Sequence, residues 1–437
     1  MVNHPAPEDL LDVNEAEEII EDDGDHPMDE PSDDEDNDGD QEVQLENDAS
    51  GYFDSHTDSI FTIATHPQEP TLHITGGGDD VGYIFRSIPK QGDDGQVHPF
   101  ACTQIQQLPK HADSITAAAF TASGAYAITA GLDGAVHVFK APVGNANGQW
   151  QQTARIQEVE EIVWMAPAPL GDAFALGALD GSVWIYDIEA SGTPVIRHVF
   201  NIFSVSCTAG AWSKDGTLLA ATSEDGGLHV WHTGTGEVIV TLDTSDARFV
   251  VESGLFSVGI SPSGAALVIG GGEGELRVIA LRGDARGKLI ASLKPHTESV
   301  ESIAFHPSVP VVATASVDGT IAILDPTKAW AVRGTLSGHQ EAVVKVEWVP
   351  DCGQEWLLTS CGVDGTVRRW DARLGTELGV WRGHLGGNQD EGEGGVLGFV
   401  QTRDRVVTAG DDHVALVFDV SKALGVAGAG PSVGIPR

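Results

Sequence analysis

The chain has 437 residues, of which 65 are acidic and 24 are basic, so its formal net charge is −41. This length excludes a single small core and leaves two or three ordinary domains or one large repeat architecture. The negative charge disfavours nucleic-acid phosphate or an anionic bilayer as the main ligand, and it predicts a basic partner.

The first fifty residues differ in composition from the rest of the chain. They contain 21 acidic residues and no lysine or arginine, and the first basic side chain is Arg86. Because so charged a segment cannot bury enough apolar surface to offset its ordering entropy, residues 1–50 are predicted to be a disordered acidic tail. Residues 51–437 hold the other 44 acidic residues and all 24 basic ones, so the folded part is also acidic.

Signals for export, metal binding and cofactor binding are missing from the sequence. The amino terminus has neither a basic region nor an apolar core, and no stretch is apolar enough for a membrane span. The cysteines form no C-x-x-C pair, which fits a reducing compartment. Residues 34–45 imitate a calcium loop but end on leucine where the loop needs glutamate. We expect no cofactor, no metal and a cytoplasmic protein, with the nucleus as a second location.

From residue 51 onward a unit of about 46 residues recurs eight times. Each unit has short alternating apolar runs and one acidic turn residue, which in chain order is Asp79, Asp133, Asp180, Asp225, Glu273, Asp318, Asp364 and Asp412. Such a period with four short strands per unit is typical of a β-propeller. The sequence predicts an all-β fold, a single eight-bladed propeller over residues 51–420, closed by an outer strand around Tyr52 and Phe53. Residues 421–437 are predicted to be a flexible tail.

The units resemble the WD-repeat family, in stretches such as LDGAVHVFK, EDGGLHVWH and VDGTVRRWD. In that family a buried Asp, His, Ser or Thr, and Trp are joined by hydrogen bonds. Units one, two, six and eight keep the histidine but replace the tryptophan, and units three, four and five lack the histidine. Only the seventh unit has all four residues, and the resemblance assigns them as a structural tetrad: His339, Ser360, Asp364 and Trp370.

Two features have the residue types of an enzyme or nucleotide site. Asp364, His339 and Ser360 could form a hydrolase triad, but catalysis requires a solvent-reachable hydroxyl beside oxyanion donors, and a propeller places this trio inside a blade. The glycine-rich runs near Asp79 and Glu273 precede strands, so no helix offers its N-terminus to a phosphate. The sequence therefore predicts a protein that is not an enzyme.

The distinctive feature of the eight units is the acidity of their loops. In the WD-repeat family the loop with the histidine and the loop before the turn aspartate lie on one face around the channel, the top face. The resemblance places on this face a set of candidate partner-binding residues: Asp113, Glu158, Glu160, Glu161, Glu224, Glu252, Glu298, Glu301 and Asp411. A long loop after His384 adds Asp390, Glu391 and Glu393.

An alternative interpretation is that these are the ordinary polar loops of an acidic domain. Against it, Glu161 and Glu301 lie at apolar strand starts, where an inward-facing charge without a cationic partner would be costly. Trp164 is interpreted as core packing rather than as a ligand-stacking residue. Phe203 is interpreted in the same way, with the channel mouth as its alternative place.

Four stretches resemble one branch of the WD-repeat family more closely: QEVEEIVWMAPAPL, ESVESIAFHP, VDGTIAILDPT and VDGTVRRWDARLGTELGVWRGH. This branch comprises the dedicated chaperones of a large-subunit ribosomal protein of the universal L-sixteen family, and the angio-associated migratory cell proteins. The resemblance implies a monomeric, non-enzymatic chaperone. It would capture the basic N-terminal segment of the newly made ribosomal protein on its acidic top face, co-translationally, and deliver it to pre-60S particles for 60S assembly.

The free energies of exposed and of partly desolvated ion pairs predict different roles for the tail and for the top face. Exposed ion pairs contribute only ~0.2–1 kcal/mol each, so the tail is expected to attract the partner at a distance. Partly desolvated contacts with arginine contribute ~1.5–3 kcal/mol per charged hydrogen bond, and for these we expect Glu161, Glu224, Glu301 and Asp411.

Two other functions are compatible with the sequence. The sequence WDAR at residues 370–373 resembles the Trp-Asp-x-Arg motif with which substrate receptors of cullin-type ubiquitin ligases meet an adaptor. A histone-binding propeller is the other alternative, because it shares the same charge logic.

Overall fold

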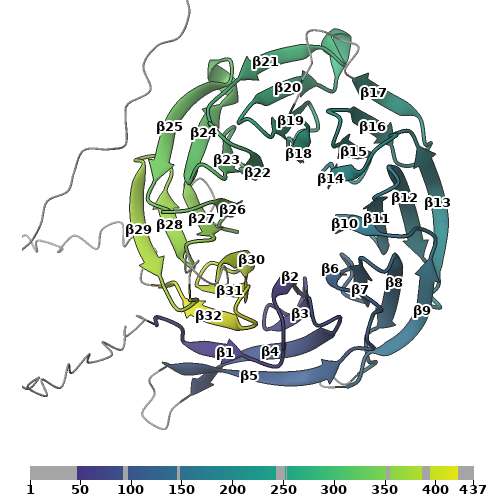
Figure 1. The fold of residues 1–437 in the computed structure, drawn as a ribbon, viewed down its shortest axis with the longest axis vertical. Helices are drawn as coiled ribbons and strands as arrows, with labels where there is room; N and C mark the ends of the chain where they lie inside the picture. Colours follow the sequence, from purple (N-terminus) through teal and green to yellow (C-terminus); the bar gives the residue numbers. More distant parts are fainter. Residues whose placement is uncertain are drawn as a thin grey trace, which may run out of the picture. The chain divides into compact units, whose positions relative to one another are not determined.

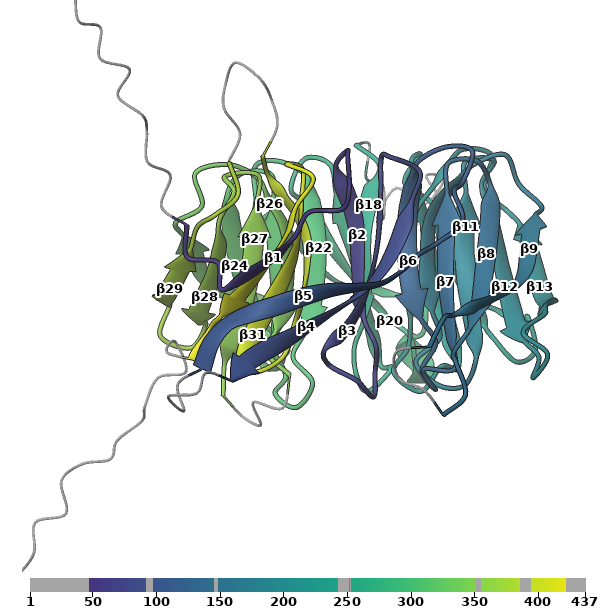
Figure 2. The ribbon, with the colours of Figure 1, turned by 90° about the horizontal axis from the view of Figure 1, so that it is seen from below.

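Eight four-stranded antiparallel sheets make up the part of the chain that the structure describes. The computed structural model describes residues 47–91, 97–144, 148–242, 251, 253–350, 355–385 and 394–421. The sheets are arranged around a common centre as the blades of a propeller (Figures 1 and 2). The predicted eight-bladed all-β fold is confirmed.

The first four blades follow one another directly in the chain. Their strands are β2 (Ile60–Thr65), β3 (Leu72–Gly77), β4 (Gly82–Gln91) and β5 (Val97–Gln107) in blade one; β6 (Ile115–Phe120), β7 (Tyr126–Gly131), β8 (Ala135–Lys140) and β9 (Gln151–Gln157) in blade two; β10 (Ile162–Pro167), β11 (Ala173–Ala178), β12 (Ser182–Ile188) and β13 (Pro194–Asn201) in blade three; and β14 (Cys207–Trp212), β15 (Leu218–Ser223), β16 (Leu228–His232) and β17 (Val238–Leu242) in blade four.

The second half repeats this order, with one strand of blade eight supplied by the start of the chain. The strands are β18 (Leu255–Ile260), β19 (Ala266–Gly271), β20 (Leu276–Ala280) and β21 (Leu289–Leu293) in blade five; β22 (Val300–Phe305), β23 (Val312–Ser316), β24 (Thr320–Asp325) and β25 (Ala331–Ser337) in blade six; β26 (Val343–Trp348), β27 (Leu357–Gly362), β28 (Val367–Asp371) and β29 (Thr376–Trp381) in blade seven; and β30 (Val396–Gln401), β31 (Arg405–Gly410), β32 (Ala415–Asp419) and β1 (Gly51–Phe53) in blade eight.

The ring is closed by β1, which pairs antiparallel with β32, as the sequence predicts. The closing strand is anchored by Phe53, whose buried ring stacks on Phe85 of blade one with a centroid distance of 4.3 Å. Residues 47–50 were predicted to belong to the tail, but the Asp48 amide donates to the Arg382 carbonyl at 2.8 Å, so this stretch is hydrogen-bonded to the propeller. The remaining tail predictions, residues 1–46 and 422–437, lie outside the described residues.

The blades are held together by alternating buried faces and by tight turns. In β8, Val136 and Val138 are buried on one face and Phe139 on the other, so the strand packs against both neighbouring blades. The Asp-Gly turns need glycine where they approach the next loop. At Gly134 the backbone has φ 69°, and an added Cβ would lie 2.0 Å from the Val159 carbonyl oxygen.

A β-bulge recurs at the same place in every innermost strand. The first and third residues of these strands pair with consecutive residues of the next strand, so the second residue has no partner. The bulge residues in blade order are Phe61, Thr116, Val163, Thr208, Phe256, Glu301, Val344 and Leu397. They form an inner ring at the edge where the innermost strands begin, because these strands line the centre of the propeller (Figure 1).

Helical structure in the described ranges consists of two 3₁₀ turns, η1 (Gly283–Ala285) and η2 (Pro326–Lys328). None of the described helices is long and apolar enough to cross a membrane.

Candidate functional site

The loops that enter the innermost strands and the turns after the second strands meet at one edge of the propeller. In blade one His56, from the entering loop, contacts Asp79, from the β3–β4 turn, at 3.1 Å, and its other ring nitrogen contacts Thr75 at 2.9 Å. Equivalent His–Asp contacts of 2.8–3.2 Å occur in blades two, six, seven and eight. We call this edge, with its entering loops and turns, the top face.

The seventh blade contains the complete four-residue network. His339 contacts Asp364 at 3.0 Å through Nδ1 and Ser360 at 2.7 Å through Nε2, and the Trp370 indole donates to Ser360 Oγ at 2.9 Å. Burial acts to raise the pKa of Asp364, but hydrogen bonds from His339 and Thr366 and the charge of His339 outweigh it and lower this pKa to about 2. Ser360 is fully buried, so it offers no accessible hydroxyl for catalysis. His339, Ser360 and Asp364 instead hold the loop that enters β26.

The depressed pKa of Asp364 predicts a specific pH dependence of stability. Because the folded value lies below the ordinary 3.8, the carboxylate stabilises the fold above pH 4 and this contribution is lost as the pH falls towards 2. Asp364→Asn should therefore lower the free energy of unfolding by about 2 kcal/mol at pH 7 and by much less near pH 2.5. Urea unfolding at both pH values measures this, with Asp113→Asn on the exposed top face as control. A deficit that does not change with pH would contradict it.

Blades three, four and five replace the histidine with other residues at the same offset, four residues before the innermost strand. These residues are Glu158, Phe203 and Val251. The Phe203 ring packs edge-on against His229 with a centroid distance of 5.0 Å, so it fills the place of the imidazole. The buried Trp231 Nε1 has no hydrogen-bond partner within the described residues, because Ala221 stands where blade seven has Ser360.

Trp164 packs between blades three and four, as expected from the sequence. Its indole nitrogen donates to Cys207 Sγ at 3.2 Å. The ring lies against Gly177 and Gly210, where an added Cβ would come within 2.1 Å of it.

The predicted carboxylates lie on the top face with different exposure. Glu161 and Asp411 are half-buried, Glu252 lies outside the described residues, and the others are exposed, namely Asp113, Glu158, Glu160, Glu224, Glu298 and Glu301. Asp411 accepts a hydrogen bond from Ser59 of blade one at 2.5 Å. The loop acids Asp390, Glu391 and Glu393 also lie outside the described residues.

The two glutamates at apolar strand starts differ in the structure: Glu301 is exposed and does not face inward, whereas Glu161 is half-buried. Glu161 ends the entering loop just before β10 and is only half-buried. Glu301 is the bulge residue of β22, and the bulge breaks the alternation that would have directed it inward. Desolvation of these two groups would require a bound partner.

The top face carries an unbalanced charge. Its described loops and turns contain three Lys or Arg residues, Lys110, Lys294 and Arg382, and twenty Asp or Glu residues. Lys110 pairs with Asp80 at 3.2 Å and Lys294 with Glu273 at 3.5 Å. None of the eight described candidate carboxylates forms an ion pair in the structure. These anions are therefore available to a cationic partner.

Two exposed aromatic side chains on the inner ring were missed in the sequence. Phe61 is 40% exposed and Phe256 is 39% exposed, and both are bulge residues. The sequence feature that could have indicated their exposure is their position, because each is the second residue of an innermost strand. If the strands had no bulge, the alternation of buried and exposed residues would place both rings on a packed face.

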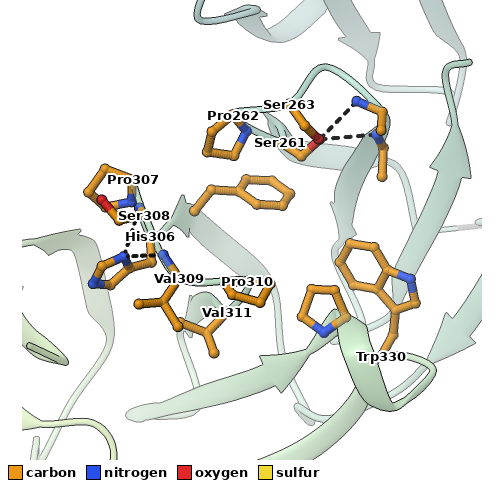
Figure 3. Close-up of a pocket in the computed structure, with 14 residues that line it drawn as sticks. Ser261, Pro262, Ser263, His306, Pro307, Ser308, Val309, Pro310, Val311 and Trp330 are labelled. Atoms are coloured by element: carbon orange, nitrogen blue, oxygen red, sulfur yellow. Dashed lines mark hydrogen bonds between the residues drawn. The ribbon is translucent and has the colours of Figure 1, made fainter. Parts of the chain in front are cut away.

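An apolar hollow lies at the edge opposite the top face. It is formed by the turns between β18 and β19 and between β22 and β23, together with Trp330 (Figure 3). The His306 ring accepts the amides of Ser308 and Val309 at 3.1 and 2.9 Å, which fixes one of these turns. The hollow contains no candidate carboxylate, so it is separate from the top-face site.

The WDAR residues lie at the end of β28 and in the turn that follows it. Trp370 is buried in the network described above, and Asp371 accepts the amides of Arg373 and Leu374 at 2.9 and 3.0 Å. The tryptophan therefore has a structural role. In the described ranges no group of three or more His, Cys, Asp or Glu residues could hold a metal ion.

Comparison with known proteins identifies the family. The model of the WD domain, G-beta repeat matches residues 102–140, 196–232, 287–325 and 330–371. The ribosome assembly protein SQT1 of Saccharomyces cerevisiae is 32% identical over 409 residues, which cover 87% of this chain and 88% of that protein. The chain belongs to the SQT1 family of WD-repeat proteins.

The chain is also similar to a human protein and to a solved complex. The human angio-associated migratory cell protein is 26% identical over 387 residues, which cover 85% of this chain and 80% of that protein. A crystal structure of Chaetomium thermophilum Sqt1 bound to the N-terminus of the ribosomal protein L10 is 40% identical, with a TM-score of 0.77. It covers 86% of this chain and all of that chain.

Proposed function

We propose that this chain is a dedicated chaperone that captures the basic N-terminal segment of a newly made large-subunit ribosomal protein on its top face and delivers it for 60S assembly. The observation that carries this proposal is the set of top-face carboxylates without ion pairs. The Sqt1 structure with the N-terminus of L10 supports the identity of the partner. In this role the chain binds and shields the basic segment without covalent chemistry. We propose the cytoplasm as its location, with the nucleus as a second location.

The energetics favour partly desolvated contacts over many exposed ones. A nanomolar complex requires about 12 kcal/mol, whereas exposed ion pairs contribute ~0.2–1 kcal/mol each. Half-buried Glu161 and the inner-ring residue Glu301 would be covered by a bound peptide, so their hydrogen bonds to arginine would be stronger, at ~1.5–3 kcal/mol. Release follows from charge density, because ribosomal RNA offers more anionic groups than the top face.

Titration calorimetry with a synthetic peptide of the L10 N-terminus tests the proposal. A histone-tail peptide of equal net charge serves as comparator, because it tests the histone-binding alternative. We expect the L10 peptide to bind at least tenfold more tightly, with an affinity that falls as salt is raised. No binding of the L10 peptide at low salt, or equal affinity for both peptides, would contradict a dedicated client.

The acidic tail is expected to act on association rather than on the final complex. Residues 1–46 contain 20 acidic and no basic residues, and the chain enters the described part at Asn47, whose side chain lies beside Gly383 and so next to the top-face residue His384. Deleting residues 1–46 should slow peptide association several-fold at low salt and leave dissociation unchanged. Stopped-flow fluorescence measures both rates. An unchanged association rate would remove the tail from the capture step.

A further inference from the structure

The inner ring places an aromatic side chain beside a carboxylate at one position. Phe256 of β18 and Glu301 of β22 are the bulge residues of adjacent innermost strands. Between them, Ser257 Oγ donates to the Val300 carbonyl at 2.6 Å, which joins the residue after Phe256 to the residue before Glu301. The two exposed side chains therefore leave neighbouring backbones on the same edge of the propeller.

The glycines around Phe256 give its ring room on the top face. An added Cβ at Gly272 would lie 3.0 Å from the ring, and one at Gly254 would lie 3.5 Å from it. The same Gly254 lies against the Glu224 carbonyl, where an added Cβ would be 2.5 Å from the oxygen. The Glu224 turn of blade four, Phe256 of blade five and Glu301 of blade six are therefore successive neighbours. In the described part of the chain neither glutamate forms an ion pair.

We propose that Phe256 and Glu301, with Glu224 beside them, form a subsite that prefers arginine to lysine in the bound basic segment. This inference rests on the proposed function and names the side chain that the site selects. A guanidinium is planar and weakly hydrated, so it can stack on the Phe256 ring while it donates two parallel hydrogen bonds to the Glu301 carboxylate. An ammonium is compact and strongly hydrated, so it gains the charge attraction with little of the stacking.

The chain itself provides a matched control. Phe61 is also a bulge residue and is equally exposed, but its neighbours on the inner ring are Leu397 and Thr116. It therefore offers an aromatic face without an adjacent inner-ring carboxylate. Phe61→Leu removes the same group as Phe256→Leu from an equivalent backbone position.

The experiment compares two synthetic basic peptides that differ only in carrying arginine or lysine at every cationic position. Calorimetry at 150 mM salt is expected to show about tenfold tighter binding of the arginine peptide to the wild type. Phe256→Leu should reduce this preference to about twofold while both peptides still bind, and Glu301→Gln should reduce it as well. Phe61→Leu should keep the tenfold preference. Thermal unfolding of each variant verifies that it is folded.

The outcomes separate this inference from the proposed function. Tight binding of both peptides to the wild type without preference, or a preference that survives in Phe256→Leu, would overturn the subsite and leave the capture of basic segments intact. Failure of the wild type to bind either peptide would overturn the proposed function and the subsite with it.

Discussion

Replacing Glu161 and Glu301 together by lysine should weaken binding of the basic N-terminal segment at least a hundredfold. The two residues lie on the top face of blades three and six, and neither forms an ion pair in the described structure. Each substitution removes a charged hydrogen bond of ~1.5–3 kcal/mol and adds a repulsion, so the pair exceeds the ~3 kcal/mol that corresponds to a hundredfold change. Calorimetry with the L10 peptide measures the loss.

The matched control reverses two carboxylates at the opposite edge. Glu237 precedes β17 and Asp284 lies in η1, and both are exposed. Glu237→Lys with Asp284→Lys changes the net charge of the protein by the same amount. We expect less than a threefold effect on affinity from this control. Equal losses in the two double variants would show that only total charge matters and would exclude the top face as a specific site.

Removing residues 1–53 should destabilise the propeller strongly, whereas removing residues 1–46 should leave its thermal unfolding midpoint unchanged. The longer deletion removes β1, so β32 loses its hydrogen-bonded partner and becomes an exposed edge. It also removes Phe53, which is 4% exposed and packs against Phe85, and loss of a buried phenylalanine side chain costs ~3–5 kcal/mol.

Scanning calorimetry of the two deletions and of Phe53→Ala measures this effect. We expect the midpoint to fall by several degrees in Phe53→Ala and further in the deletion of residues 1–53, with aggregation on heating. Equal midpoints for the two deletions would show that the ring is stable without its closing strand.

The fold could be predicted from the sequence because its information is repeated eight times. The turn acids from Asp79 to Asp412 fix the period, and Tyr52 and Phe53 supply the apolar strand that the last blade lacks. Each blade packs mainly against its neighbours, so local alternation of apolar residues is sufficient to place the strands.

The details of the site could not be predicted in the same way. Alternation alone directs Glu301 inward, but a bulge at the second residue of β22 turns it to solvent. The same bulge in β18 exposes Phe256. Bulges depend on how two strands pair and not on the residues of one strand, so they leave little signal in a single sequence. The replacement of histidine by Phe203 is visible in the sequence only once the strand starts are known.

The acidity of the top face has an energetic cost, and the proposed function gives a reason for it. Carboxylates on one face repel one another and disfavour the compact state, whereas a paired arrangement such as Lys110 with Asp80 would not. An unpaired set suits the proposed binding and release of a polycation, because fixed internal ion pairs would compete with that partner.

Hydrogen–deuterium exchange of the full chain with and without the L10 N-terminal peptide tests whether the peptide binds on the top face. We expect slower exchange on binding in the loops that enter β10 and β22 and in the β15–β16 turn with Glu224. We expect no change in the turns around Ser261 and His306, which line the hollow at the opposite edge (Figure 3). Slower exchange in that hollow, with the top-face loops unchanged, would show that the peptide does not bind on the top face.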